Sequence, residues 1–266
     1  MFSAQTISRD LGKIRKQAPL VHNITNYVVM NLTANALLSI GASPVMAHAF
    51  EEVEDMVNLA SAVVINIGTL SSRWVEAMHK AILSAEHKNI PVVLDPVGAG
   101  ATNYRTVTAR RLLQEGRVAI IRGNGSEIKA LIESEARTRG VDSLDVAETA
   151  VEAGKELSRK YGCAVSISGP TDIIVKDEKI IRIANGHPLM PRVTGLGCTA
   201  SAITGAFAAV NSNYLEAAAE AMAVVGICGE LAARKARGPA SFELNFLDWL
   251  YRIDKKEIEK KLRIAE

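Results

Sequence analysis

The sequence predicts an α/β fold with a mainly parallel central sheet, helices on both of its faces and a small β-hairpin at one edge. Short apolar runs alternate with helical patterns along most of the chain, and this alternation is typical of βαβ units. The runs are mostly continuous and rich in Val and Ile, which indicates strands covered on both faces. Between residues 172 and 184, two apolar runs flank the segment Lys-Asp-Glu-Lys, which favours an edge hairpin.

The individual elements follow from this alternation in chain order. Each expected strand is a short Val- and Ile-rich or otherwise apolar run; these runs lie at 19–24, 44–47, 62–67, 92–95, 118–122 and 164–168. Longer segments of mixed polarity separate the runs and are expected to be helices, at 28–40, 52–58, 72–87, 105–114, 127–133 and 145–160. From residue 197 the chain is expected to be helical to its end. No repeat or Pro/Ser-rich linker interrupts the pattern, so residues 1–266 are predicted to form a single domain.

The composition is that of an ordinary soluble globular protein long enough to bury a sizeable core. Hydrophobic residues make up 48% of the 266 residues and charged residues 23%. The formal net charge is +2, from 31 basic and 29 acidic residues, so the balance indicates neither nucleic acid nor an anionic membrane as a partner. A basic cluster between residues 255 and 263 is interleaved with glutamates, and we interpret it as a solvated helix face.

Cysteine usage and the N-terminal region both indicate a cytoplasmic protein. The three cysteines, Cys163, Cys198 and Cys228, are odd in number and form no Cys-x-x-Cys pair, so neither a disulfide framework nor a zinc site is expected. The first ten residues lack the apolar core of a signal peptide. Residues 17–50 contain no charged side chain, but His, Asn and Thr are scattered through them and are costly in lipid. We expect this region to be buried in protein, partly at a subunit contact.

The most informative segment is 193–201, Val-Thr-Gly-Leu-Gly-Cys-Thr-Ala-Ser. We interpret it as a tight turn that leads into a buried helix, because glycine permits the backbone angles and close approach that such a turn requires. The first N–H groups of a helix lack intrahelical partners and the dipole there favours negative charge, so a phosphoryl group in transfer fits this position. The thiolate form of Cys198 is expected to be favoured there. The alternative is a simple connection in which the cysteine is a small buried hydrophobe.

Three of the expected strands carry polar side chains at or just beyond their ends. Asp95 follows one apolar run, Arg122 and Glu127 follow the next, and Ser168 follows a third. In open α/β sheets ligands bind beyond the carboxyl ends of the strands. Asp95 and Glu127 suit Mg²⁺, which takes few carboxylates and keeps several waters. Arg122 suits a nucleotide phosphate because its charge is permanent and its donors form a fork, and Ser168 can donate its hydroxyl to the same phosphates.

Each of these residues also has a purely structural interpretation. Asp-Pro after a strand commonly opens a turn, Asn124 or Ser126 can cap a helix, and Glu127 can be an acid in a first helical turn. All of them nevertheless fall at one edge of the expected sheet and suit one reaction, phosphoryl transfer, which needs a metal, cations on the phosphates and an anion hole. The sequence has no P-loop, no Gly-x-Gly-x-x-Gly after its first strand, no His-Glu-x-x-His and no Gly-x-Ser-x-Gly. A nicotinamide-dependent oxidoreductase is therefore disfavoured.

Five segments in this order resemble the hydroxyethylthiazole kinases of thiamine salvage, a family of the ribokinase-like superfamily: VHNITNYVVMN, GASPVMAHA, VLDPVGAGAT, IRGNGSEI and VTGLGCTASA. The resemblance runs from about residue 15 to 250. It implies transfer of the γ-phosphate of ATP to the primary hydroxyl of 4-methyl-5-(2-hydroxyethyl)thiazole, with Mg²⁺ as cofactor. It also implies a homotrimer with sites between subunits.

The same resemblance implies roles for individual residues. Arg122, Ser168 and Asn124 are expected to contact ATP, and Asp95 and Glu127 the metal ion. The family more often has threonine at position 168, so a hydroxyl is kept and a methyl group is lost.

On the acceptor side, the resemblance implies thiazole contacts from Met46, Gly195 and Asn23. The backbone N–H groups from Gly195 through Gly197 to Cys198 are expected to steady charge on the moving phosphoryl group. A thiol is a modest base at neutral pH, so we expect Cys198 to assist and the anion hole to dominate. Other kinases and the hydrate dehydratases of this superfamily generally carry an acid at position 198, so Cys198 argues against them. They are kept as alternatives, together with a non-catalytic nucleotide sensor.

Overall fold

The computed structural model describes residues 2–132 and 146–265. In this part of the chain nine strands form one sheet, in the order β2-β1-β3-β4-β5-β6-β7-β8-β9. The first six run parallel to one another and the last three pair antiparallel. Their bounds are β1 Leu20–Ile24, β2 Ser43–Val45, β3 Ala62–Asn66, β4 Val92–Asp95, β5 Ile120–Asn124, β6 Ala164–Ser168, β7 Asp172–Lys176, β8 Lys179–Ile183 and β9 Ile264–Ala265.

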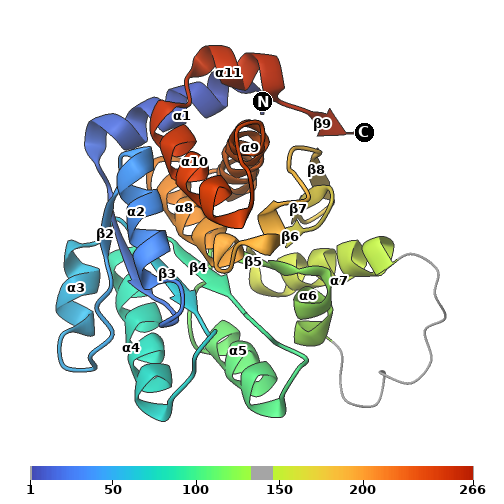
Figure 1. Cartoon of the computed structure of the whole chain (residues 1–266). Helices are drawn as coiled ribbons and strands as arrows, with labels where there is room; N and C mark the ends of the chain where they lie inside the picture. Colours follow the sequence, from blue (N-terminus) through green and yellow to red (C-terminus); the bar gives the residue numbers. More distant parts are fainter. Residues whose placement is uncertain (1, 133–145, 266) are drawn as a thin grey trace.

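Helices cover both faces of the sheet (Figure 1). One face lies under α1 (Ala4–Gln17), α2 (Met30–Ile40), α8 (Leu196–Val210), α9 (Tyr214–Ala233), α10 (Pro239–Arg252) and α11 (Lys255–Lys261). The other face lies under α3 (Val53–Leu59), α4 (Ser72–Lys88), α5 (Asn103–Glu115), α6 (Gly125–Ile132) and α7 (Val146–Tyr161). Each face has its own cluster of buried apolar side chains, because alternate residues of each strand point to opposite sides. This two-sided burial explains the continuous apolar runs of the parallel strands.

The predicted fold class is confirmed. Strands β4 and β6 match the expected ranges from end to end, the other four parallel strands lie within two residues of theirs, and the hairpin is formed by β7 and β8. The expected connecting helices are present, although residues 133 and 145, at the ends of two of them, lie outside the described residues. The expectation of helix to the chain end is wrong for the last residues, because β9 adds to the sheet beside β8.

Helix α1 was not among the expected elements, although the sequence contains its signals. Ser3 accepts the backbone N–H of Thr6, and the Thr6 hydroxyl in turn accepts the backbone N–H of Ser3, so the two form a reciprocal cap. Ile7, Leu11 and Ile14 recur at helical spacing and are buried. These positions are enough to dock the helix on the face that also holds α8 and α9.

The uncharged region 17–50 is buried in part only. Strand β1 and the inner side of α2 belong to the core. Four large apolar side chains in it are exposed in this chain: Tyr27, Val28, Leu38 and Phe50. The prediction of burial is confirmed for β1 and the inner side of α2. The subunit contact expected for the rest of the region stays a prediction.

Two buried carboxyl groups meet where α1, α8 and α9 approach one another. Asn211, which follows α8, donates to Asp10 at 3.0 Å and to Glu220 at 3.2 Å. Burial raises the pKa of Asp10, but Arg9 and Lys13 outweigh it and hold that pKa below its usual range. Burial, together with the charge of Asp10, raises the pKa of Glu220 to about 8. Glu220 is therefore protonated in the folded protein at neutral pH.

The Glu220→Gln variant should remove a pH dependence of stability. Because the pKa of Glu220 is raised on folding, its stabilising contribution is full below about pH 4.5 and is lost as the pH rises towards 8. Over that window the free energy of unfolding should fall as the pH rises, by at most about 1 kcal/mol per pH unit. Urea denaturation at several pH values measures this slope. An unchanged slope in Glu220→Gln would show that Glu220 is ionised in the folded protein.

Candidate active site

The turn before α8 is closed by a glycine that no other residue can replace without strain. Gly195 is the N-cap of α8 and has φ +85°, in the left-handed region. A Cβ atom on Gly195 would lie 2.6 Å from Cγ1 of Val29, so the turn packs directly on the residue that precedes α2. The first intrahelical bond runs from the N–H of Thr199 to the carbonyl of Gly195. The N–H groups that precede Thr199 are therefore available to an anion at the helix start.

Asp95, the last residue of β4, is the buried centre of a hydrogen-bond network. Its Oδ2 accepts from the Ser201 hydroxyl of α8 at 2.7 Å and from the Asn66 amide at the end of β3 at 2.8 Å. Burial raises the pKa of Asp95 to about 6, and the negative charge of Glu127 contributes, while Arg122 opposes the shift. Above pH 6 the network thus holds a carboxylate within the protein.

A chain of amides links the Asp95 carboxylate to the Cys198 thiol. Asn26, just after β1, donates from Nδ2 to Oδ1 of Asn66 at 2.8 Å and to Sγ of Cys198 at 3.4 Å. Because Asn66 also donates to Asp95, the order of contacts is Cys198, Asn26, Asn66, Asp95. Residues from β1, β3, β4 and α8 therefore meet at the carboxyl edge of the sheet.

The expectation that the Cys198 thiolate is favoured is wrong. Burial, followed by the nearby charge of Asp95, raises the pKa of this thiol to about 11. The Asn66 and Asn26 side chains and the charge of Arg122 oppose this shift but do not cancel it. Cys198 is therefore a neutral thiol at physiological pH.

Arg122 of β5 is the buried cation of the site. Its side chain opposes the raised pKa values of both Asp95 and Asp172, so its charge lies close to these two carboxyl groups. A Cβ atom on Gly197 would lie 3.1 Å from Nη1 of Arg122, so the guanidinium lies against the first turn of α8. Among the described residues, Nε of Arg122 has no hydrogen-bond partner. A cation with a free donor at a helix N-terminus is suited to a phosphate group.

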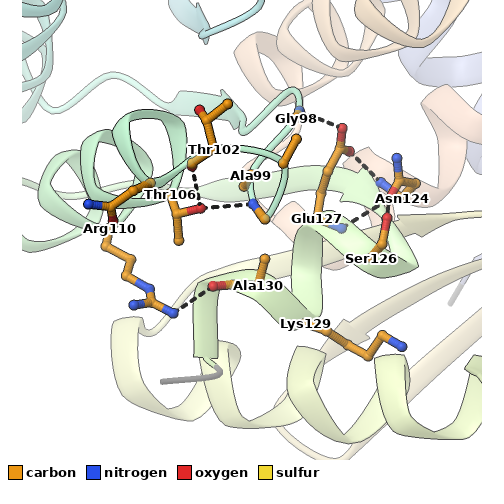
Figure 2. A pocket seen from close by; sticks show the side chains of 13 residues that line it. Gly98, Ala99, Thr102, Thr106, Arg110, Asn124, Ser126, Glu127, Lys129 and Ala130 are labelled. Carbon is orange, nitrogen blue, oxygen red and sulfur yellow. Dashed lines mark hydrogen bonds between the residues drawn. The ribbon is translucent and has the colours of Figure 1, made fainter. Parts of the chain in front are cut away.

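Asn124 and Glu127 cap helix α6 reciprocally (Figure 2). Oδ1 of Asn124 accepts the N–H of Glu127 at 2.9 Å, and Oε2 of Glu127 accepts the N–H of Asn124 at 2.8 Å. The structural interpretation of Asn124 as a helix cap is confirmed. Oε1 of Glu127 accepts the N–H of Gly98 at 2.9 Å, so Glu127 also joins the loop after β4 to the start of α6.

A cavity of about 700 Å³ lies beside Glu127, between the loop after β4 and helices α5 and α6 (Figure 2). Two polar side chains that line the cavity make hydrogen bonds to backbone groups. Thr106 accepts the N–H of Gly100 at 2.8 Å, and Arg110 donates to the carbonyl of Ala130 at 2.7 Å. Asn124, Ser126 and Lys129 line the same cavity. The cavity therefore borders the candidate site on the side of Glu127.

The remaining candidate residues lie further along the same edge. The Ser168 hydroxyl, at the end of β6, donates to the carbonyl of Gly123 at 3.4 Å. Met46 is half-buried and directly follows β2. Asn23 of β1 is buried, and its Oδ1 has no hydrogen-bond partner among the described residues. Strands β2 and β6 are five places apart, about 24 Å, so two ligands placed end to end would reach both Met46 and Ser168.

Most of the candidate residues form one group. Asp95, Glu127, Arg122, Gly197 and Cys198 lie around the start of α8. Ser168 borders this group, because it pairs with Asn124 in the sheet and donates to the carbonyl of Gly123. Met46, which follows β2, lies apart from it. Sequence reasoning missed three residues that connect the group: Asn26, Asn66 and Ser201. Asn66 had a signal, because it is a polar residue at the end of an apolar strand, as Asp95 is.

A buried carboxylate and a cation at a glycine-bounded helix start, on the carboxyl edge of a parallel sheet, define a small-molecule phosphotransferase of the ribokinase-like class. The fold is shared with a ribokinase-like superfamily protein from Enterococcus faecalis V583, at a TM-score of 0.64 and 14% identity over 89% of this chain and 87% of the other. The model of the hydroxyethylthiazole kinase family matches residues 11–256. The chain belongs to this family.

Two similar proteins agree with this assignment. A hydroxyethylthiazole kinase from Syntrophus aciditrophicus (strain SB) is 62% identical over 253 residues, which are 95% of this chain and 94% of that protein. The structure of a hydroxyethylthiazole kinase from Pyrococcus horikoshii OT3 superposes with a TM-score of 0.91, at 44% identity over 98% of each chain. Within the described residues, no helix is both long enough and apolar enough to span a membrane.

Proposed function

We propose that the protein transfers the γ-phosphate of ATP to the primary hydroxyl of 4-methyl-5-(2-hydroxyethyl)thiazole, a reaction of thiamine salvage. The observation that supports this most directly is the convergence of Asp95, Arg122 and Cys198 on the start of α8. Phosphoryl transfer depends mainly on positioning and on charge stabilisation, and these groups provide both.

On the nucleotide side, Arg122 is the principal phosphate ligand in our proposal. Its guanidinium lies against Gly197, where the N–H groups of α8 and the helix dipole also favour negative charge. Ser168 and Asn124 complete the ATP contacts from β6 and from the end of β5. Because the Asn124 side chain and the Asn124 N–H both bind Glu127, Asn124 contributes mainly by holding Glu127 in place.

Asp95 and Glu127 would hold Mg²⁺ together with phosphate oxygens and water. The described residues contain no group of three or more His, Cys, Asp or Glu side chains that could hold a metal. The donor set still fits Mg²⁺, which is typically bound by one or two carboxylates and the substrate's phosphates. Glu127 raises the pKa of Asp95, so the two carboxylates act on each other electrostatically. When bound, the ion would neutralise charge on the phosphates.

On the acceptor side, Gly195, Asn23 and Met46 would border the thiazole. Met46 offers a polarizable thioether to a sulfur heterocycle. The Oδ1 of Asn23, which has no partner in the part of the chain that the structure describes, can accept from a donor of the ligand or from an ordered water. The N–H groups from Gly195 to Cys198 would stabilise charge on the phosphoryl group as it moves between the two substrates.

The Cys198→Ala variant should keep at least about a tenth of the catalytic rate. A thiol with a pKa of about 11 is almost wholly protonated at pH 7.5 and is a poor acceptor for the substrate's proton. We expect kcat to fall by no more than about tenfold, as for the loss of one positioning contact. Steady-state kinetics measure this. Complete loss of turnover with intact nucleotide binding would contradict the assisting role.

We further propose a cytoplasmic homotrimer with sites between its subunits. Tyr27 and Val28 are exposed and directly follow Asn26, which contacts Cys198, so an apolar surface adjoins the site. Leu38 on α2 and Phe50 extend the set of exposed apolar groups in the same uncharged region. The cysteines are free, as expected of a reducing compartment. Light scattering during gel filtration tests the trimer.

The experiment that tests the function is ADP formation by the purified chain with ATP and Mg²⁺, measured with and without the thiazole alcohol. Turnover that requires the thiazole supports the proposal. Turnover with pyridoxal or a hydroxymethylpyrimidine instead indicates another kinase of this fold. Nucleotide binding without turnover on any of these alcohols indicates a sensor and refutes the proposal.

A further inference from the structure

Arg105 joins two loops of the site without being part of it. Its side chain comes from the first turn of α5, where Thr102 caps the helix by accepting the N–H of Arg105. Nη1 donates to the carbonyls of Ile67 at 2.9 Å and Val97 at 2.7 Å, and Nη2 donates to the carbonyl of Gly68 at 2.8 Å. One guanidinium therefore binds the loop after β3 and the loop after β4 together.

The loop after β3 supports the Cys198 side of the site. A Cβ atom on Gly68 would lie 2.6 Å from Nδ2 of Asn26, so the Gly68 backbone packs directly against the amide that donates to Sγ of Cys198. Gly68 also donates its N–H to Oδ1 of Asn66 at 2.9 Å. Movement of Gly68 would therefore disturb one contact of each asparagine that connects Cys198 to Asp95.

The loop after β4 supports the Glu127 side. Gly98 has φ +74°, and a Cβ atom there would lie 3.1 Å from Cδ of Arg105, so the stem of Arg105 packs on this glycine. The N–H of Gly98 donates to Oε1 of Glu127 at 2.9 Å. The contacts of Arg105 thus extend through Gly98 to one carboxylate of the site and through Gly68 to the thiol.

We propose that Arg105 is a positioning residue of the phosphoryl transfer, which fixes Cys198 and Glu127 relative to each other by tying the loops after β3 and β4. This inference rests on the proposed function. A planar guanidinium suits the task because two of its nitrogens bind carbonyls of different loops in fixed directions, whereas a lysine ammonium is a single flexible point charge. Misplacement of reacting groups by about 1 Å can cost about 10²-fold in rate.

The test compares Arg105→Met with Lys88→Met. Lys88, at the end of α4, also donates to three backbone carbonyls, those of Val57, Asn58 and Ala60, but these precede β3 at the opposite end of the sheet. Both variants lose a cationic side chain that donates hydrogen bonds to backbone carbonyls of a loop, so both should have a somewhat lower melting temperature. Only Arg105→Met should lose about 10²-fold in kcat with little change in the KM for ATP.

Two further readouts separate positioning from folding. The rate at which iodoacetamide alkylates Cys198 should rise several-fold in Arg105→Met and stay unchanged in Lys88→Met; Cys163 and Cys228 are buried and give little background. Propylguanidinium should restore part of the kcat of Arg105→Ala. If Arg105→Met does not fold, Arg105→Lys, which keeps the charge, takes its place. Compared with the wild type, Arg105→Lys is expected to have a lower kcat and a faster alkylation rate, with smaller changes than those expected for Arg105→Met.

Unchanged kcat and unchanged alkylation in a folded Arg105 variant would overturn the proposal. So would equal losses in the Arg105 and Lys88 variants without guanidinium rescue, because that result indicates a purely structural role. If the wild-type chain shows no thiazole-dependent turnover, the proposed function fails. The alkylation rates then still decide whether Arg105 holds Asn26 against Cys198.

Discussion

Asp95→Asn should lower kcat by about 10³-fold without unfolding the protein. The carboxylate of Asp95 lies between Ser201, Asn66, Arg122 and Glu127, at the point where the proposed reaction needs negative charge for a metal ion. Asparagine keeps the size of the side chain, and its Oδ1 can still accept from Ser201 and Asn66. What is lost is the charge, so the variant separates electrostatics from packing.

The same substitution should leave stability intact or increase it. Burial raises the pKa of Asp95 to about 6 in the folded protein, above its value in the unfolded chain. As the pH rises through this range, ionisation of Asp95 therefore lowers the free energy of unfolding. At pH 8 a neutral asparagine avoids that cost. Thermal melting and steady-state kinetics at pH 8 measure the two effects side by side.

Glu220→Gln is the matched control for Asp95→Asn, because it also neutralises a buried carboxyl group but lies between α1, α8 and α9, away from the site. It should keep full activity. An Asp95→Asn variant with more than a tenth of wild-type kcat would contradict the role assigned to Asp95. Ser201→Ala, which removes one donor and keeps the charge, should have a smaller effect than Asp95→Asn.

Much of the architecture was predictable from sequence because parallel strands covered on both faces have a simple signature. Strands β3 (Ala62–Asn66) and β4 (Val92–Asp95) each consist of apolar residues followed by one polar residue at the end. Since the carboxyl ends of parallel strands share one edge, the placement of Asp95 and Arg122 in one region followed from order alone. The role of the two glycines at the start of α8 was predictable for a similar reason, because a tight turn into a buried helix requires glycine.

The connections between these residues were not predictable, because they join positions far apart in the chain. Nothing in the sequence near Asn26 indicates that its amide reaches Cys198, or that Arg105 binds the carbonyls of two other loops. The protonation of Cys198 was also misjudged. Its position at a helix N-terminus is visible in the sequence, whereas burial and the charge of Asp95, which decide its pKa, depend on the packed site.

Gly197→Ala should also separate activity from stability, by a steric route. Gly197 lies in the first turn of α8 and is exposed, and a Cβ atom there would be 3.1 Å from Nη1 of Arg122. The methyl group would occupy the surface where we propose that the phosphoryl group meets Arg122 and the N–H groups of α8. We expect kcat/KM to fall by about 10²-fold, comparable to the loss of an oxyanion-hole donor.

Folding should tolerate this alanine well, because Arg122 can shift by a few tenths of an ångström and alanine favours a helix over glycine by up to about 1 kcal/mol. Gly12→Ala is the matched control: Gly12 is an exposed glycine within α1, and a Cβ atom there meets nothing within 4 Å. Both variants should melt at or above the wild-type temperature, and only Gly197→Ala should lose activity. A methyl group against Arg122 should disturb any anion bound there. If Gly197→Ala keeps the wild-type kcat/KM, the phosphoryl group therefore does not bind at the start of α8.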